Sequence, residues 1–275
     1  MLNSEEYLLG RTSEEYQRLE RQAMLWQPLA LRMIKETGLK EGMKCLDVGC
    51  GTGNVMRLMG SIVGKGGSVS GIDIDEKVGN EALNILNNIG DSVYYFESKD
   101  VMIPGAIEPG TYDFIYTRFV LIHQTDPVSM VRKLYDALKP GGTLLVQDYD
   151  MASIKVNEKT IGVVDYFRDL LIKIFTQTGK DPEAGMHLSI YFEEAGIGSP
   201  DGTDASSIIT KALLFMQMIK AVALSMKPGI TGLNLSTPDR FEQFIRDTEQ
   251  KGIELGNYYY TWPMVNSAWK HKKQN

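Results

Sequence analysis

The stretch CLDVGCGTGN at residues 45–54 places three glycines within five positions, directly after a short apolar run. Glycine loses more conformational entropy on folding than other residues, so a dense cluster usually serves a tight turn, a positive φ angle or a ligand that touches bare backbone. The segment that follows, NVMRLMGSIVG (54–64), has the apolar spacing of a helix. Together they predict a strand, a glycine loop and a helix, which limits the chain to α/β folds.

Strand and helix patterns continue to alternate as far as residue 149. Strands are expected at 43–48, 68–74, 92–98, 112–117 and 142–149. A first helix is expected over 13–37, and Asp75 and the pair Asp126-Pro127 are expected to open two others. Such alternation requires right-handed crossovers and builds a parallel sheet that is covered on both faces. Ligands of these sheets bind outside the carboxyl ends of the strands.

The pattern changes after residue 150. Further elements are expected as helices at 158–178, 182–196, 208–226 and 238–252, a weak edge strand near 197–207 and a late strand at 257–265. We therefore expect four parts: an N-terminal helical cap (1–38), a ligand-binding core (39–150), a helical insertion that covers the substrate (151–256), and a final strand and tail (257–275).

Composition excludes several classes of function. The net charge of −6 and a pI near 5.3 argue against binding to nucleic acid. The basic run at 270–273 is interpreted as a solvated terminus. No apolar stretch approaches the roughly 20 residues of a membrane helix, and the N-terminus lacks a signal-peptide pattern. With two cysteines and three histidines at no metal-ligand spacing, we expect a cytoplasmic protein without a metal.

The glycine loop fits one of three common ligands best. A dinucleotide loop would read GxGxxG, but Asn54 stands at the last position, and no phosphate-loop GxxxxGK sequence is present. Asp47 beside the loop would repel a pyrophosphate and attract the ammonium of S-adenosylmethionine. Asp73, 20 positions after Gly53, is placed to accept ribose hydroxyls. Asp100 closes the third strand, where its carboxylate could accept a hydrogen bond from the adenine amino group.

Five motifs follow one another in order across residues 40–150. They are CLDVGCGTGN (45–54), GIDID (71–75), FESKDV (96–101), YDFIYTRFVLIHQTDP (112–127) and LKPGGTLLVQD (138–148). In these motifs the chain resembles class I S-adenosylmethionine-dependent methyltransferases, in particular those related to the ubiquinone and menaquinone biosynthesis enzymes. The resemblance implies a Rossmann-like fold with a mostly parallel seven-stranded sheet, helices on both faces and a helical lid. It implies cofactor contacts from Asp47, Gly49, Gly51, Gly53, Asp73, Ile74, Asp100, Val101 and Thr117.

The candidate catalytic residues are Tyr16, Arg118 and His123. Arg118 is interpreted either as part of a buried ion pair or as an anchor for an acidic acceptor. The resembling group often has two adjacent histidines after strand four, whereas only His123 stands here. We expect these three residues and Tyr166 to face one largely apolar pocket.

The predicted function is methyl transfer from S-adenosylmethionine to a small organic molecule at an O, N or C atom. Two alternatives remain open at this point: a cofactor-binding regulatory or partner subunit, and a protein methyltransferase. Neither nucleic acid nor a membrane is expected as a partner, and a homodimer is the candidate assembly.

Overall fold

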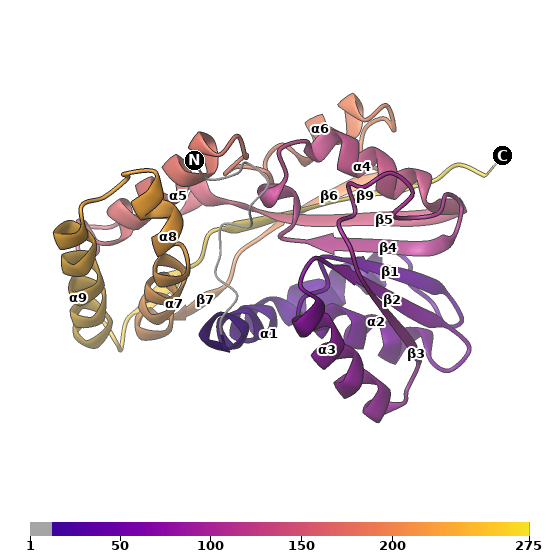
Figure 1. Ribbon diagram of the computed structural model, residues 1–275, viewed down its shortest axis with the longest axis horizontal. Helices are drawn as coiled ribbons and strands as arrows, with labels where there is room; N and C mark the ends of the chain where they lie inside the picture. The colour runs from indigo at the N-terminus through magenta and orange to yellow at the C-terminus, as the bar shows by residue number, and fades with distance from the viewer. Residues whose placement is uncertain (1–12, 275) are drawn as a thin grey trace.

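The computed structural model describes residues 13–274. Its main sheet contains seven strands in the order β3-β2-β1-β4-β5-β9-β6 (Figure 1). The strands are β1 (Lys44–Val48), β2 (Ser68–Asp73), β3 (Val93–Ser98), β4 (Tyr112–Arg118), β5 (Leu138–Asp150), β6 (Gly202–Ser206) and β9 (Met264–His271). The strands β1 to β5 pair in parallel, and β9 runs antiparallel to both β5 and β6. The predicted mostly parallel sheet of seven strands is confirmed.

Helices cover the two faces of this sheet (Figure 1). One side carries α1 (Ser13–Glu36), α2 (Asn54–Val63) and α3 (Glu76–Ile89), and the other carries α4 (Pro127–Asp136) and α6 (Leu188–Glu194). Asp75 caps α3 by accepting a bond from the Val78 N–H at 3.2 Å. Asp126 caps α4 in the same way from the Ser129 N–H at 2.9 Å. Both predicted helix starts are therefore confirmed. In each case a carboxylate one residue before the helix accepts a hydrogen bond from a backbone N–H that has no partner within the helix.

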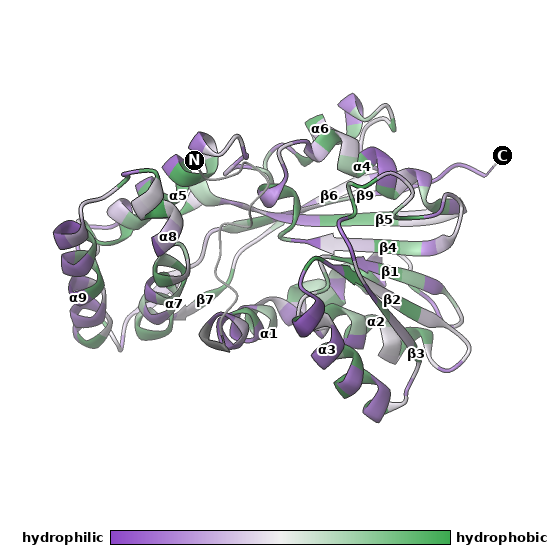
Figure 2. Cartoon of the chain, in the orientation of Figure 1, coloured by the Kyte–Doolittle hydropathy of each residue, from purple (hydrophilic) through white to green (hydrophobic). Residues whose placement is uncertain are grey.

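A second group of helices lies beyond one end of the sheet (Figure 1). It contains α5 (Val164–Gln177), α7 (Ala212–Ser225), α8 (Lys227–Gly232) and α9 (Pro238–Glu254). A separate antiparallel pair of short strands, β7 (Ile209–Lys211) and β8 (Tyr259–Thr261), accompanies them. Figure 2 shows hydrophilic residues prevailing along α9 and α3, whereas the middle of β5 is hydrophobic.

The predicted late strand at 257–265 is wrong in its bounds. Two strands occupy this region, and Pro263 stands between them because it has no N–H to donate to a sheet. Only the second strand, β9, joins the main sheet, where it pairs with the predicted edge strand β6. The basic run at 270–273 is not a solvated tail either. Lys270 forms a 3.0 Å ion pair with Asp201, and the Lys272 ammonium donates to three backbone carbonyls at the end of α4 and the start of β5.

The core lies between the sheet and its two helical layers. Strand β5 is buried at every residue from Gly142 to Asp150, as expected for a strand covered on both faces. From α1, the side chains of Trp26, Met33 and Ile34 are fully buried against this core. Within residues 13–274, no helix has the length and apolarity to cross a bilayer, and no three His, Cys, Asp or Glu side chains are grouped as a metal site would require.

Candidate active site

A cavity of about 300 Å³ opens at the carboxyl ends of β1, β2 and β4. Helix α1 closes it on one side, and α5 and α7 close its far end. Its lining includes most of the residues expected from the sequence. These are Tyr16, Asp47, Gly49, Gly51, Asp73, Ile74, Asp100, Val101, Arg118 and His123. The structure therefore brings residues from four separate motifs and from α1 into one site.

The three glycines of the loop after β1 have positive φ angles but different surroundings. A Cβ atom on Gly49 would stand 2.3 Å from a methyl of Val120, and one on Gly53 would stand 3.0 Å from the Cβ of Ala82. A Cβ on Gly51 would meet no atom within 4 Å. Gly49 and Gly53 thus allow the loop to pack closely against the protein, whereas Gly51 leaves backbone open to the cavity.

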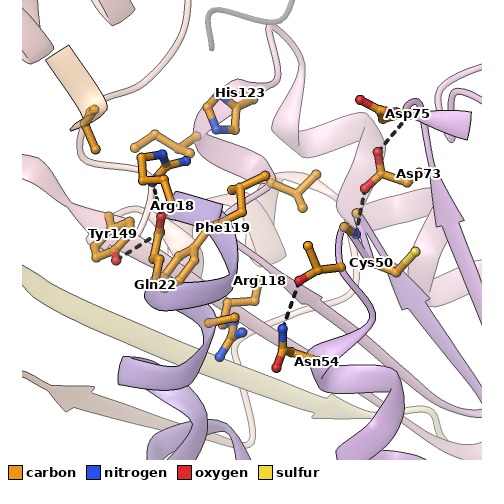
Figure 3. A pocket seen from close by; sticks show the side chains of 18 of the residues that line it. Arg18, Gln22, Cys50, Asn54, Asp73, Asp75, Arg118, Phe119, His123 and Tyr149 are labelled. Carbon is orange, nitrogen blue, oxygen red and sulfur yellow. Dashed lines mark hydrogen bonds between the residues drawn. The ribbon is translucent and has the colours of Figure 1, made fainter. Parts of the chain in front are cut away.

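Asp73 ties the glycine loop to the end of β2. One carboxylate oxygen accepts the Gly51 N–H at 2.8 Å, and the other accepts the Asp75 N–H at 2.9 Å (Figure 3). Burial raises the pKa of Asp73, and these backbone N–H groups act in the opposite direction. Each oxygen retains a second lone pair that could accept a hydroxyl from a ligand. The carboxylate is therefore held rigidly at the edge of the cavity.

Asp47 and Arg118 form the deep corner of the cavity. Asp47 is only 3% exposed, and among the described residues its Oδ2 atom has no hydrogen-bond partner. Burial raises the pKa of Asp47 to about 7, although the nearby Arg118 guanidinium lowers it. Arg118 is half-buried and donates to the carbonyl of Trp26 at 3.4 Å. A buried carboxylate with an unsatisfied oxygen is costly, so this corner suits a cationic ligand group.

Helix α1 is tied over the cavity by side chains at its N-terminal half. The Tyr16 hydroxyl donates to the carboxylate of Asp75 at 3.0 Å. One turn and a half later, the Gln22 amide donates to the Tyr149 hydroxyl at 3.2 Å (Figure 3). Tyr16 thereby joins α1 to the turn after β2, and Gln22 joins it to the end of β5. The predicted position of this helix beside the site agrees with the structure.

An aromatic stack stands where β4 and β5 end. The rings of Phe119 and Tyr149 are parallel with centroids 4.0 Å apart, and Trp26 meets both of them edge-on. Phe119 has a φ angle of +60°, which costs a non-glycine residue about 1–3 kcal/mol. Such strain persists only where surrounding contacts hold it, and here the stack lines the cavity. Sequence reasoning did not select Phe119, although it directly follows Arg118.

His123 lies on the cavity wall beside the ring of Phe175, with centroids 5.6 Å apart. Burial, together with the positive charges of Lys180 and Arg18, lowers the pKa of His123 to about 3. The imidazole is therefore neutral at physiological pH. The Asp148 carboxylate accepts the backbone N–H of Ile122 at 3.1 Å and so holds the segment that carries His123.

The far end of the cavity is almost entirely apolar. It is formed by α5, α7 and the loop between β8 and β9. Its side chains are Phe167, Leu171, Phe175, Phe215, Met218, Ile219, Val222, Met226 and Trp262. None of these was selected from the sequence. The available signal was the apolar face of two predicted helices, but such a face does not reveal whether it meets the core or a ligand.

A family model described as a methyltransferase domain matches residues 16–194, which is more than half of the 275-residue chain. The chain belongs to the methyltransferase-domain family. The match contains the glycine loop, the acids at the ends of β2 and β3, and the segment after β4. The resemblance expected from the five motifs is therefore confirmed.

Curated relatives of this methyltransferase domain agree with that membership. The ubiquinone/menaquinone biosynthesis C-methyltransferase UbiE of Klebsiella pneumoniae is 30% identical over 156 residues, spanning 56% of this chain and 60% of the relative. A ubiquinone biosynthesis O-methyltransferase of Thiobacillus denitrificans is 38% identical over 115 residues, or 42% and 48% of the two chains. This chain thus spans less than two thirds of either relative. The YcgJ protein of Bacillus subtilis, with a TM-score of 0.56 at 18% identity and coverage of 90% and 98%, shares the fold.

Two expected contacts of the methyltransferase domain lie outside the cavity lining. Thr117 is fully buried, and its hydroxyl donates to the Val48 carbonyl at 3.1 Å, which links β4 to β1. Successive strand residues point to opposite faces, so Arg118 reaches the cavity and Thr117 does not. Gly53 lies behind the loop, at the start of α2, where it packs against α3.

The expectation for Tyr166 is wrong. Its hydroxyl donates to Ser236 at 2.5 Å, and its ring packs on Phe244 with centroids 5.0 Å apart. These contacts place it among the outer helices, away from the cavity lining. The other three residues of that predicted group, Tyr16, Arg118 and His123, do share the pocket.

Proposed function

We propose that this methyltransferase domain binds S-adenosylmethionine and transfers its methyl group to a small organic acceptor. The observation that supports this most is the two-part cavity. Its glycine-loop end is lined by Asp47, Asp73 and Asp100, and its other end is apolar. A polar donor and a less polar acceptor can therefore meet inside one cavity.

The donor end fits S-adenosylmethionine in three respects. Gly51 leaves room for a ligand to touch backbone, and the unsatisfied oxygen of Asp47 suits an ammonium group. Asp73 is placed for the ribose hydroxyls, and Asp100 stands at the rim for the adenine amino group. Ile74 and Val101 supply apolar surface for the adenine ring. When bound, this cofactor supplies a methyl group activated by a sulfonium.

The acceptor end supports a small and largely apolar substrate. Ligand pockets commonly measure about 300–1,000 Å³, and this whole cavity, with its donor end included, lies at the lower end of that range, which leaves space for only a small acceptor. Helices α1, α5 and α7 border the cavity and so reduce its contact with solvent, which strengthens electrostatic interactions inside the site. We propose that α5 and α7, within the segment 151–256 expected as a helical insertion, cover the acceptor, whereas β6 of the same segment belongs to the main sheet.

The protein's main contribution to the reaction is positioning. Holding two reactants in line can supply a large share of rate acceleration without a charged catalyst. A histidine with a pKa near 3 is a weak base, so we assign His123 to hydrogen bonding with the acceptor in its neutral form. Tyr16 is assigned to holding α1 over the donor, because its hydroxyl already donates to Asp75.

The test is incubation of the purified chain with methyl-labelled S-adenosylmethionine and a small-molecule extract. Label in a low-molecular-weight product supports the proposal, and the Asp73→Ala variant should lower that signal. Label in a protein fraction would instead favour a protein methyltransferase. Cofactor binding without transfer across several extracts would favour a regulatory subunit. A cytoplasmic location, a homodimer and the absence of nucleic-acid binding stay predictions.

A further inference from the structure

Four carboxylates line the cavity, and they differ in how the protein satisfies their oxygens. Asp73 accepts two backbone N–H groups, as described above. Asp75 accepts the Val78 N–H and the Tyr16 hydroxyl. Asp100 accepts the backbone N–H of Met102 at 2.8 Å. Asp100 is exposed, so water can reach its other oxygen, whereas among the four only Asp47 has a buried oxygen without a hydrogen bond to any residue that the structure describes.

The cations of the cavity show the same contrast. Arg18 forms an ion pair with Glu15 at 2.7 Å, and Lys99 forms one with Glu97 at 2.7 Å. Arg118 has no carboxylate partner among residues 13–274, although it is half-buried. Its guanidinium instead donates to a backbone carbonyl and lies 5.3 Å from the ring centre of Phe119. A buried guanidinium keeps its charge and usually binds an anion.

Asp47 and Arg118 meet in one corner because their strands are neighbours. Asp47 on β1 is in register with Tyr116 on β4, and Arg118 is two residues further along β4 on the same face. The guanidinium is close enough to lower the pKa of Asp47, yet no ion pair joins the two side chains. Opposite charges that share a cavity without contact leave room for a ligand bearing both complementary charges.

We propose that Arg118 binds the α-carboxylate of the donor's methionine moiety, beside the ammonium at Asp47, and does not anchor the acceptor. This inference rests on the proposed function. Carboxylate and ammonium of an amino acid are attached to one carbon, so a single zwitterion can satisfy both charges of the corner. The acceptor then meets the apolar wall and the neutral His123, which selects against an acidic acceptor.

The test is calorimetry of the full chain with three ligands that differ only in the amino-acid part. S-adenosylhomocysteine carries both charges, its decarboxylated analogue carries only the ammonium, and 5′-methylthioadenosine carries neither. Arg118→Gln should lower the affinity for S-adenosylhomocysteine about tenfold or more. It should change the affinity for the other two ligands less than about twofold. Asp47→Asn should weaken both ammonium-bearing ligands and spare 5′-methylthioadenosine. Arg118→Lys, which retains the charge, should recover part of the lost affinity.

Three results would overturn this inference. An unchanged affinity of Arg118→Gln for S-adenosylhomocysteine, together with a raised KM for the acceptor, would assign Arg118 to the acceptor. An equal loss for all three ligands would indicate a structural role, and the melting temperature and the Arg118→Lys variant would show whether the fold is affected. Failure of the unmodified chain to bind any of the three would overturn the proposed function itself, and the inference with it.

Discussion

Gly51 and Gly53 offer a matched pair of substitutions that separates ligand contact from folding. Both residues have positive φ angles, +47° and +74°, so alanine at either position adds a similar backbone strain. The added Cβ differs in its surroundings. At Gly51 it enters open cavity space, whereas at Gly53 it lies 3.0 Å from the Cβ of Ala82 and 3.2 Å from Leu86.

The expected magnitudes follow from this difference. A left-handed conformation costs a non-glycine residue about 1–2 kcal/mol, and both variants lose this much stability. The free energy of unfolding of Gly53→Ala falls by about 1 kcal/mol more, because the added methyl group presses against α3, which is already in close contact. Gly51→Ala is expected to bind S-adenosylhomocysteine about tenfold more weakly or worse, which corresponds to about 1.4 kcal/mol or more, since its methyl group occupies the space of the ligand.

Calorimetry and urea unfolding of the two variants provide the assay. We expect Gly51→Ala to be the more stable variant and the weaker binder, and Gly53→Ala to show the reverse. Normal binding by Gly51→Ala would refute the reasoning, because the open backbone would then not face the ligand. If the loss of affinity paralleled the loss of stability in both variants, the two glycines would serve folding alone.

Four further outcomes are expected. Asp73→Ala should lower the affinity for S-adenosylhomocysteine about tenfold in calorimetry, because charge-assisted hydrogen bonds to the ribose are lost. An unchanged affinity would contradict the assignment. The pKa of Asp47 is raised to about 7 and an ammonium ligand requires the ionised form, so affinity should fall as pH drops below 7, by up to about tenfold per pH unit. A ligand without the ammonium, 5′-methylthioadenosine, should lack that dependence. Since His123 stays neutral above its pKa of about 3, His123→Gln should keep kcat within about tenfold and leave the pH profile between 5 and 9 unchanged. Lys272→Ala should lower the free energy of unfolding in urea by about 1 kcal/mol through the carbonyls it satisfies, with the exposed Lys273→Ala as a control of no effect.

The donor end of the site was predictable because its residues are placed by short-range rules. Asp47, Gly51 and Asp73 each stand at the end of a strand, or one turn beyond it, and parallel strands bring such ends to one edge. The helix starts at Asp75 and Asp126 followed from local capping chemistry. Even here, the sequence did not tell which side chain of β4 faces the cavity. The register of β4 decides this, since Thr117 and Arg118 point to opposite faces.

The acceptor end could not be predicted in the same way. Its wall comes from α5 and α7, whose apolar faces have the same periodicity whether they meet a core or a cavity. The sequence shows a carboxylate partner for Arg18, because Glu15 stands three residues earlier on the same helix, but it does not show what surrounds Arg118. Only the packing of α1 beside the end of β4 brings the Trp26 carbonyl to the Arg118 guanidinium, which has no carboxylate partner among the residues described. Local spacing therefore specifies the glycine loop and the acids that we propose for the donor end, whereas contacts between distant segments determine the surroundings of Arg118 and the shape of the apolar end.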